Sequence, residues 1–481
     1  MIAFTLRFKT AVLSFILLLL LPDIGFATVQ LPSFFSDGMV LQQQTNASIW
    51  GWAKQVAVVK VTTSWNKKTY NATADSKGKW SIKVATPVAG GPYTISISDG
   101  EPVTIKNILI GEVWLCSGQS NMEMPMKGFK DQPIIGSNDA IFNSTNDQIR
   151  IYTVPRAVER SAKDTSKTFF WKTANPENIS NFSAVGYYFG RLLQQQLKVP
   201  VALVLNGYSG SPAEAFMSTE SLKAFPEIAV PSATGTEKLS NKNATTLYNG
   251  MIHPFAGYTI KGCLWYQGES NYDRPDQYEK LFPAMVQLWR NEWGQGNFPF
   301  YFAQIAPYAY STLPTSTRNE KLNSAYLRDA QRKSLSSIPN SGMVVLMDAG
   351  DEKTIHPFNK EVVGKRFAYL ALGDTYSFKG FAYQSPLYDS LMVTGNVATI
   401  RFKNAPNGLT CFTKPLTQFE IAGADKTFYP AQAVIARGMI QVSSPMVATP
   451  VAVRYAFRDF IVGELFSAEG YPVSSFRTDD W

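Results

Sequence analysis

A candidate nucleophile, Ser120, follows a buried apolar run in this chain. The run Val113–Cys116 leads into Ser117–Glu123, whose letters are SGQSNME. A serine on the turn after a buried strand, with a glycine two residues before it, can expose its hydroxyl above the sheet, where a nucleophile acts. Met122 replaces the last glycine of Gly-x-Ser-x-Gly, which disfavours a standard α/β-hydrolase elbow. The structural alternative for Ser120 is a helix N-cap.

The base for such a serine is expected at His356. A hydroxyl nucleophile needs a base with a pKa near neutrality, and the base needs a group that fixes its tautomer. The chain has two histidines, and only His356 follows acidic side chains, those of Asp348 and Asp351. His253 stands in the same four letters, Ile-His-Pro-Phe, and we expect it to be a hydrogen-bonded structural residue near the site.

Two glycine-containing loops could complete the site. The loop Asn206–Ala215 follows an apolar run, and a flexible glycine in it could direct a backbone N–H toward a developing oxyanion. The loop Trp265–Asn271, with the letters WYQGESN, adds an amide side chain at the same sheet edge. Both segments also suit ordinary loops, where glycine and asparagine are common.

Apolar strand-like runs alternate with helical segments from about residue 109 onward. We expect strands at Ile108–Leu115, Val199–Leu205, Ile260–Tyr266, Phe298–Ala306 and Met343–Met347. Helices are expected at Ala184–Leu197, Asp276–Glu292, Leu322–Leu335 and Lys360–Leu372. This alternation predicts an α/β domain with a mainly parallel sheet. Ligands bind at the carboxyl ends of the strands in such sheets, and the candidate residues all follow strands.

Short β-like runs flank this region on both sides. Residues 28–108 contain Ala57–Thr63, Trp80–Val84 and Tyr93–Ile97 between turn signals, which predicts a small β-sandwich. After about Gly373 the β-like runs are Val393–Phe402, Thr410–Ile421, Ala433–Val442 and Val451–Phe460. We therefore expect an N-terminal β-sandwich over 28–108, an α/β domain over 109–375 and a C-terminal β-rich module over 376–481.

The first 27 residues have the pattern of a secretory signal peptide. Arg7 and Lys9 precede the apolar run Ala11–Leu21, and Gly25-Phe26-Ala27 provides small residues for cleavage. The run is shorter than the ~20 residues of a spanning helix, so an uncleaved anchor is the disfavoured alternative. We expect a secreted or periplasmic protein with no stable membrane span.

The composition excludes several classes of protein. The 481 residues carry a formal charge of +8, with 17% charged and 45% hydrophobic residues, as in a folded rather than a disordered chain. The positive surplus forms no dense Lys/Arg run, so we expect no nucleic-acid partner. Two histidines and three scattered cysteines exclude a His-rich or Cys-based zinc site, and we expect no metal. Cys116 and Cys263 are expected to be buried thiols rather than a disulfide.

Three blocks of sequence carry a resemblance to a known family. They are Gly118–Met122, Trp265–Asn271 and Ile355–Pro357, in that order, with further similarity at Phe182–Tyr187 and Asn249–Pro254. Together they resemble the sialate O-acetylesterase family of SGNH-type hydrolases over about residues 110 to 375. The resemblance implies a flavodoxin-like three-layer α/β/α domain that acts on O-acetyl esters of sugars without a cofactor.

The resemblance also implies roles for single residues. Ser120 would be the nucleophile and His356 the base. The oxyanion hole would comprise the backbone N–H of Ser120, Gly210 and the side chain of Gln267. Ser209 stands where relatives commonly have glycine, which is tolerable if its φ is negative.

The third member of the triad departs from the family pattern. Many SGNH-type enzymes have an acidic residue two or three positions before the histidine, where this chain has Thr354 and Lys353. Asp351 is closer in the loop and is our expected third catalytic residue. The alternatives are Asp348, at the strand end, and a Ser–His dyad oriented by a backbone carbonyl.

The expected partner is an acetylated glycan, and two alternatives stay open. The substrate could be acetylated xylan or another hemicellulose in place of sialic acid. A non-catalytic carbohydrate-binding protein would also suit two β-modules and abundant Trp and Tyr. We expect the substrate pocket to be built by loops such as 123–145, 272–276 and 307–320, whereas the sequence does not indicate the oligomeric state.

Overall fold

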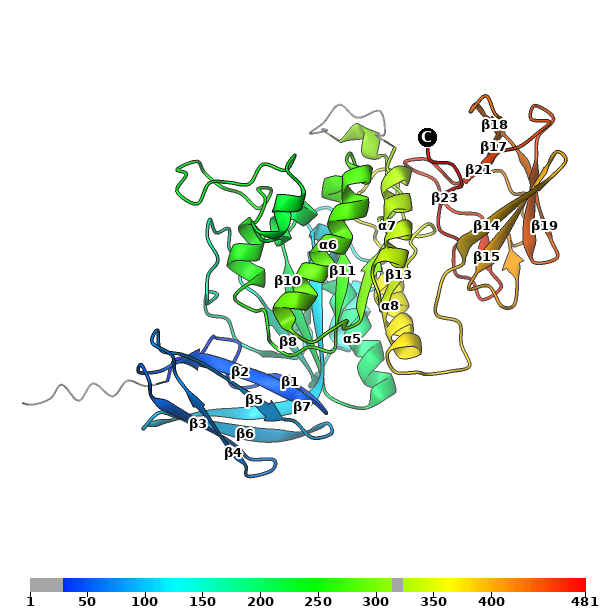
Figure 1. Ribbon diagram of the computed structural model, residues 1–481. Coiled ribbons are helices and arrows are strands. Elements are labelled where there is room, and N and C mark those ends of the chain that lie inside the picture. Colours follow the sequence, from blue (N-terminus) through cyan, green and yellow to red (C-terminus); the bar gives the residue numbers. More distant parts are fainter. Residues whose placement is uncertain (1–28, 314–322) are drawn as a thin grey trace, which may run out of the picture.

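The computed structural model describes residues 29–313 and 323–481 (Figure 1). The predicted signal peptide over residues 1–27 lies outside the described residues, as does Leu322, the expected first residue of one helix. In the described part of the chain, none of the helices has the length and apolar character needed to cross a bilayer.

The centre of the molecule is a mainly parallel sheet, as the alternation of strands and helices predicts. Its strands lie side by side in the order β13-β12-β11-β7-β10-β8, all parallel, and β9 is antiparallel at one edge. The strand bounds are β7 (Pro102–Gly118), β8 (Asn146–Thr153), β9 (Lys172–Ala174), β10 (Val201–Gly207), β11 (Gly262–Tyr266), β12 (Phe300–Ala303) and β13 (Ser341–Val344). The strand β7 therefore lies between β10 and β11, with its carboxyl end beside theirs.

Helices cover both faces of this sheet, and β7 shows why. Along this strand Trp114 and Cys116 point to one face, whereas Val113 and Leu115 point to the other, and all four side chains are buried. The first pair packs with α5 (Ala184–Leu197) and α8 (Lys360–Asp374), and the second with α6 (Pro275–Trp293) and α7 (Ala325–Ser337). A continuous apolar strand of this kind is typical of a sheet buried on both sides, so the predicted three-layer α/β/α architecture is confirmed.

Short helices occupy several of the connections. They are α2 (Ser120–Glu123), α3 (Ser137–Phe142), α4 (Pro176–Ser180), the 3₁₀ helices η1 (Ala213–Phe216), η2 (Ser221–Ala224), η4 (Glu269–Asn271) and η5 (Tyr310–Thr312), and the π-helical turn η3 (Tyr248–Ile252). Three of them, α2, η1 and η4, lie in the segments that follow the carboxyl ends of β7, β10 and β11. These segments therefore surround the centre of the sheet edge.

The N-terminal β-module shares strand β7 with the central sheet (Figure 1). The first half of β7 pairs with β6 and β1, and β6 also pairs with β3, while β2 and β5 form a separate pair. The strands are β1 (Val40–Gln42), β2 (Asn46–Trp52), β3 (Val58–Thr63), β4 (Thr69–Thr73), β5 (Lys79–Ala85) and β6 (Gly90–Ser98). The division expected between residues 108 and 109 thus falls inside one continuous strand.

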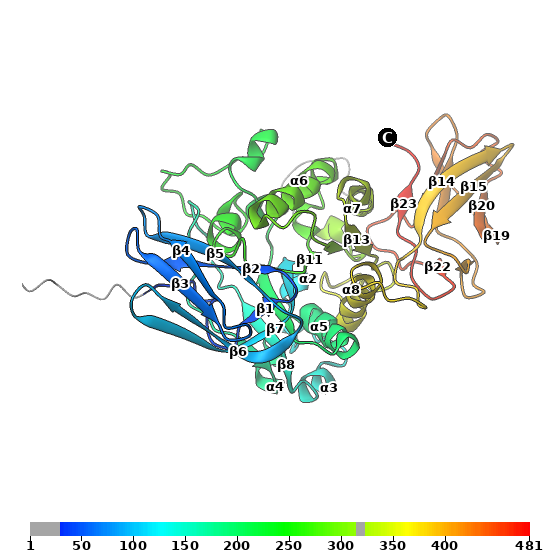
Figure 2. The ribbon, with the colours of Figure 1, turned by 60° about the horizontal axis from the view of Figure 1, so that its bottom comes forward.

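The C-terminal module consists of short antiparallel strands at the opposite side of the α/β region (Figures 1 and 2). Turns at Gly395 and Gly438, where φ is 60° and 76°, interrupt two of the predicted single runs and join the strands of two hairpins. The strands are β14 (Leu387–Thr394), β15 (Val397–Lys403), β16 (Leu409–Thr410), β17 (Phe419–Ala422), β18 (Phe428–Pro430), β19 (Gln432–Ala436), β20 (Met439–Ser443), β21 (Ala452–Tyr455), β22 (Phe466–Ser467) and β23 (Phe476–Arg477).

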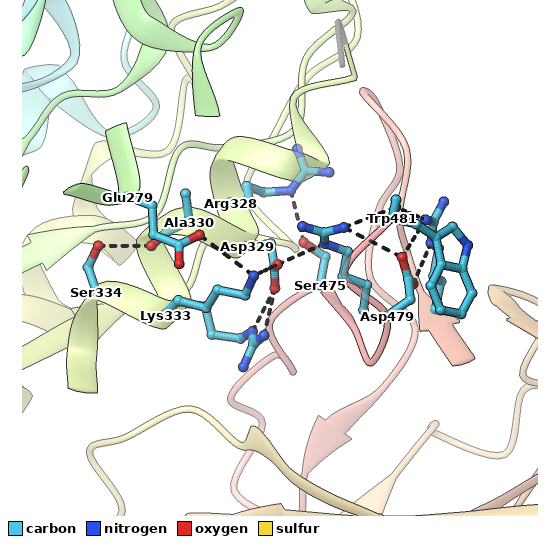
Figure 3. A network of polar contacts seen from close by, with 12 residues as sticks. Glu279, Arg328, Asp329, Ala330, Lys333, Ser334, Ser475, Asp479 and Trp481 are labelled. Carbon is cyan, nitrogen blue, oxygen red and sulfur yellow. Dashed lines mark hydrogen bonds and ion pairs between the residues drawn. The ribbon is translucent and has the colours of Figure 1, made fainter. Parts of the chain in front are cut away.

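Buried polar contacts attach the C-terminal segment to helix α7 (Figure 3). Arg477 Nε donates to Asp329 Oδ2 at 3.1 Å, and Arg328 Nε donates to Ser475 Oγ at 3.0 Å. Asp329 is 1% exposed, so its carboxylate is an internal partner for the arginine. Asp329 also pairs with Arg332 and Lys333 of its own helix, and Arg477 also lies 3.5 Å from Asp479, so the contact is part of a buried network between the last residues and α7.

The cysteines are free in the structure. Cys116 and Cys263 are fully buried, which confirms the expectation of buried thiols. Burial raises the pKa of both thiols, so neither is a thiolate near neutral pH. A cysteine nucleophile is thereby excluded at these two positions.

Candidate active site

Ser120 begins α2 directly after β7. The preceding strand ends at Gly118, whose φ is 138°, and a Cβ there would lie 2.2 Å from the carbonyl oxygen of Tyr266 on β11. Only glycine allows this approach, so the glycine of the motif lets the chain turn at the sheet edge. Ser120 is 8% exposed, and as the first residue of the helix its N–H has no intrahelical acceptor.

A cavity of about 960 Å³ opens above the carboxyl ends of β7, β10 and β11. Its lining includes Ser120, Gly210, Glu269 and His356, so four segments that are distant in sequence meet here. Of the expected loops, 272–276 contributes lining residues, and so does Leu313. Two further segments that no sequence pattern predicted, 227–229 and 242–244, also line the cavity.

The imidazole of His356 is oriented by Gln132. Nδ1 of His356 lies 2.5 Å from Oε1 of Gln132, and the ring packs edge-on against Phe129, with centroids 5.3 Å apart. Because an amide oxygen only accepts, Nδ1 carries the proton. In the neutral ring Nε2 is then unprotonated and can accept a proton.

The two candidate aspartates make other contacts, and neither has a hydrogen bond to His356 among the described residues. Oδ1 of Asp351 accepts from the N–H groups of Lys353, at 2.8 Å, and Thr354, at 3.0 Å, and so caps its own turn. Asp348 forms an ion pair with Arg366, with Oδ2 and Nη2 2.6 Å apart. Gln132 was not predicted, because the residues around it carry no pattern that points to His356.

Ser120 and His356 are brought together through their neighbours. Asn121 Nδ2 donates to the carbonyl oxygen of Ile355 at 3.0 Å, which joins the residue after the serine to the residue before the histidine. Within the described part of the chain the Ser120 hydroxyl has no hydrogen-bond partner. Hydrogen bonds of this kind are often loose in a ligand-free site and tighten when the substrate is bound.

The loop of Gly210 is held from two sides. Ser209 donates to Glu123 Oε2 through its N–H, at 2.9 Å, and through its hydroxyl, at 2.6 Å. Asn241 Nδ2 donates to the carbonyl oxygen of Ser209 at 2.8 Å. Gly210 has a φ of 72°, whereas Ser209 does not have a positive φ, so serine fits its position. The loop therefore presents the Gly210 backbone to the cavity in a fixed conformation.

Gln267 lies beneath the cavity, which differs from its expected role as an oxyanion donor. The side chain is fully buried, and Nε2 donates to Ser211 O at 3.2 Å and to Asn271 Oδ1 at 2.7 Å. Its Oε1 accepts from the Tyr278 hydroxyl at 3.2 Å. Both amide hydrogens are thus used, and Gln267 supports the loop next to Gly210 rather than facing the substrate.

His253 lies in a different cavity, together with Trp50, Trp52 and Trp80. Its Nδ1 is 3.4 Å from the Tyr248 hydroxyl and 3.9 Å from Glu292 Oε2. His253 is thus hydrogen-bonded, as expected, but it lines a different cavity from Ser120.

The electrostatic surroundings of His356 favour the neutral ring. Burial, and secondarily the ammonium of Lys360, lower the pKa of His356 to about 4. Near neutral pH the imidazole is unprotonated, which is the state that a general base requires.

Two cations, Arg274 and Lys242, are among the lining residues of the cavity. Arg274 Nη1 lies 2.9 Å from Glu214 Oε1, and its side chain is 20% exposed. Lys242 is exposed, and it has no ion pair with any residue that the structure describes. Glu227 and Asp273 also line the cavity, so its charges are mixed.

Comparisons with known proteins agree with the sequence resemblance. Residues 110–372 match the family described as "Carbohydrate esterase, sialic acid-specific acetylesterase". The sialate O-acetylesterases of Pongo abelii and Homo sapiens are each 30% identical to this chain over 407 residues, which are 76% of this chain and 74% of theirs. A crystal structure of a carbohydrate acetylesterase from Xanthomonas citri is 32% identical, with a TM-score of 0.84, and covers 94% of this chain and 100% of that one.

Proposed function

Because the chain belongs to the sialic acid-specific acetylesterase family of carbohydrate esterases, we propose that it hydrolyses O-acetyl esters of sialic acids and related glycans with Ser120 as nucleophile. Family membership makes it a carboxylic ester hydrolase. The single observation that best supports the serine mechanism is that Ser120 and His356 line one cavity, with Nδ1 of the histidine on Gln132.

The proposed reaction has two halves. Ser120 Oγ attacks the acetyl carbonyl as its proton passes to Nε2 of His356. The tetrahedral oxyanion accepts hydrogen bonds from the N–H groups of Ser120 and Gly210. When the intermediate collapses, His356 gives the proton to the departing sugar oxygen and acetyl-Ser120 remains. Water then loses a proton to His356 and attacks the acetyl group, which releases acetate and restores the serine.

A substrate carboxylate is supported by the cations of the cavity. Arg274 and Lys242 line it, and Lys242 has no carboxylate partner among the described residues. A sialic acid carries a carboxylate that such cations can bind. The carboxylates of Glu214, Glu227 and Asp273 in the same lining favour the second candidate, a neutral acetylated hemicellulose such as xylan.

The decisive experiment compares Ser120→Ala and His356→Ala with the parent enzyme. Acetate release from O-acetylated N-acetylneuraminic acid, acetylated xylan and p-nitrophenyl acetate is measured with each. Both variants should lose at least about 10³-fold in kcat, because residues that act as a unit fail together. Activity retained by Ser120→Ala excludes this nucleophile, and an inactive parent that still binds the glycans supports a binding protein. Preference for xylan by the parent selects the second substrate class.

The protein is further proposed to be secreted or periplasmic, since its first 27 residues have the pattern of a signal peptide. Expression in a secreting host followed by sequencing of the mature N-terminus tests this. A mature chain that begins at or near Thr28 supports export, whereas an intact Met1 in the exported fraction argues for an uncleaved anchor.

A further inference from the structure

Three buried polar side chains lie beside the candidate catalytic pair and have no part in the proposed reaction. Asn121 follows Ser120, Glu269 stands two residues after Gln267, and Lys360 stands four residues after His356. Their exposed fractions are 1%, 3% and 0%. Each comes from one of the segments that form the cavity, and Glu269 itself contributes to the lining, so the three connect those segments to one another.

The carboxamide of Asn121 is the centre of this group. Its Nδ2 donates to Glu269 Oε1 and, at 3.0 Å, to the carbonyl oxygen of Ile355, while its Oδ1 accepts from Lys360 Nζ. Both hydrogens of Nδ2 are therefore donated within the site, and Oδ1 accepts one hydrogen bond there. One asparagine thus joins α2, the loop after β11, the histidine loop and the start of α8.

The group is costly to bury. An ammonium and a carboxylate lie out of contact with water, and Glu269 Oε2 has no hydrogen-bond partner among the described residues. The desolvation of two charges commonly exceeds their mutual attraction, so hydrophobic residues in their place would often be as stable. Buried ionisable groups kept beside a cleft are candidates for a functional role.

We propose that Asn121, Glu269 and Lys360 are positioning residues that hold the Ser120 helix against the His356 loop and keep a positive charge beside the imidazole. This inference rests on the proposed roles of Ser120 and His356. The hydrogen bond from Asn121 to Ile355 fixes the Ser120 helix relative to the His356 loop, and the carboxylate of Glu269 stabilises the buried ammonium of Lys360.

The charges around His356 leave Lys360 as the cation that acts on it. The loop of Gln132 offers that neutral amide and the ring of Phe129. In the histidine's own loop Asp351 faces backbone N–H groups, and Asp348 is paired with Arg366. The β11 strand contributes Tyr266, whose ring centroid lies 5.6 Å from Lys360 Nζ, and the segment after it contributes Glu269.

The sign of the effect follows from these groups. Burial lowers the pKa of Lys360 to about 7, and Glu269 opposes that decrease. Below pH 7 the ammonium is thus present, and it disfavours a second positive charge on His356. Removing it should raise the pKa of His356 and move the acid limb of kcat/KM to higher pH.

The experiment measures kcat, KM and the pH profile of acetate release for Lys360→Met and Glu269→Gln. Both should lose on the order of 10- to 100-fold in kcat with little change in KM, since a misplacement of about 1 Å can cost about 10²-fold. Lys360→Met should also shift the acid limb upward. The matched control is Lys365→Met, on the exposed side of the same helix, where the lysine pairs with Glu361 at 3.1 Å. It should change neither quantity.

A variant that does not fold can be distinguished from a variant that contradicts the inference. Thermal unfolding of every variant is recorded, and a Lys360→Met protein that does not fold is replaced by Lys360→Met/Glu269→Gln, which removes both charges. Glu269→Gln is isosteric and is measured regardless. If folded variants keep kcat within about twofold and the parent acid limb, the inference is wrong. If only this inference fails, Ser120→Ala is inactive while the Lys360 and Glu269 variants resemble the parent enzyme. If the proposed function fails, Ser120→Ala itself is active.

Discussion

Nδ1 of His356 lies 2.5 Å from Oε1 of Gln132, a residue 224 positions earlier in the chain. Serine hydrolases commonly use a carboxylate at this place, where it orients the ring and stabilises the imidazolium. An amide oxygen can orient the ring equally well, but it provides no negative charge. The site therefore combines a fixed tautomer with an imidazole that stays neutral to low pH.

Replacing Gln132 should separate orientation from charge. Gln132→Ala removes the acceptor, and we expect kcat to fall by at least about tenfold because the ring is no longer held. Gln132→Glu keeps an acceptor and adds a charge, which should raise the pKa of His356 and move the acid limb of kcat/KM to higher pH. The comparison is Asp351→Asn, which should stay within about threefold of the parent. A larger loss in Asp351→Asn than in Gln132→Ala would restore the aspartate as the orienting residue.

Activity should persist to acidic pH. The pKa of His356 is lowered to about 4, so the base stays unprotonated above that value and is lost as pH falls through it. The unfolded chain would protonate this histidine near its ordinary pKa of about 6.5, so its contribution to stability decreases as pH falls from there toward 4. Acetate release and thermal unfolding between pH 3 and pH 8 test both statements. An acid limb near pH 6.5 would show that burial does not govern this histidine.

Gln267→Ala should affect stability more than catalysis. The substitution leaves the buried carbonyl oxygen of Ser211 without its donor, at about 1–3 kcal/mol, whereas Asn271 Oδ1 keeps the N–H of Ala213 and the Tyr278 hydroxyl keeps the backbone carbonyl of residue 267. The melting temperature should therefore fall, whereas kcat should fall by less than the ~10²–10³-fold typical of a lost oxyanion donor. A loss of that size with an unchanged melting temperature would return Gln267 to the oxyanion hole.

Lys242 should contribute to the choice of substrate. Lys242→Met removes an exposed ammonium from the cavity lining, and we expect KM for O-acetylated N-acetylneuraminic acid to rise by about two- to fivefold, as for an exposed charge pair. Hydrolysis of p-nitrophenyl acetate should not change, because that ester carries no carboxylate. Lys238→Met, in the same loop but not in the lining, is the control. Equal KM values for both variants would argue against a carboxylate contact here.

Asp329→Asn should weaken the attachment of the C-terminal segment without altering the chemistry. Asp329 and Arg477 are 1% and 6% exposed, and removal of one partner of an isolated buried pair costs about 3–5 kcal/mol, which is an upper bound here because Arg477 keeps Asp479 at 3.5 Å. The melting temperature should fall markedly, and kcat at low temperature should remain within about twofold, since neither residue lines the cavity. The exposed pair Lys403 and Asp389 provides the control, and Asp389→Asn should leave the melting temperature unchanged. Equal melting temperatures for the two variants would mean that the buried pair does not fasten the module.

Local pattern predicted most of the elements around the site. Helix α5 has the expected bounds, Ala184–Leu197, since its N-cap Ser183 and apolar spacing are readable within a few residues. The strand β8 was missed, and so was most of β14. The turns at Gly395 and Gly438 fell inside predicted single runs, because a turn of the chain within an apolar stretch leaves only a weak local signal.

Some features of the candidate site could likewise be predicted from local sequence, and others could not. The amino-acid sequence by itself determined that Ser120 follows a buried strand through an obligatory glycine, and it predicted His356 rather than His253 as the base. Only the tertiary structure decided that Gln132, rather than Asp351, holds the imidazole, that Gln267 lies below the cavity, and that Asn121, Glu269 and Lys360 meet. Strand periodicity and turn residues act over a few neighbouring positions, whereas these contacts depend on how loops from different strands converge at one edge of the sheet.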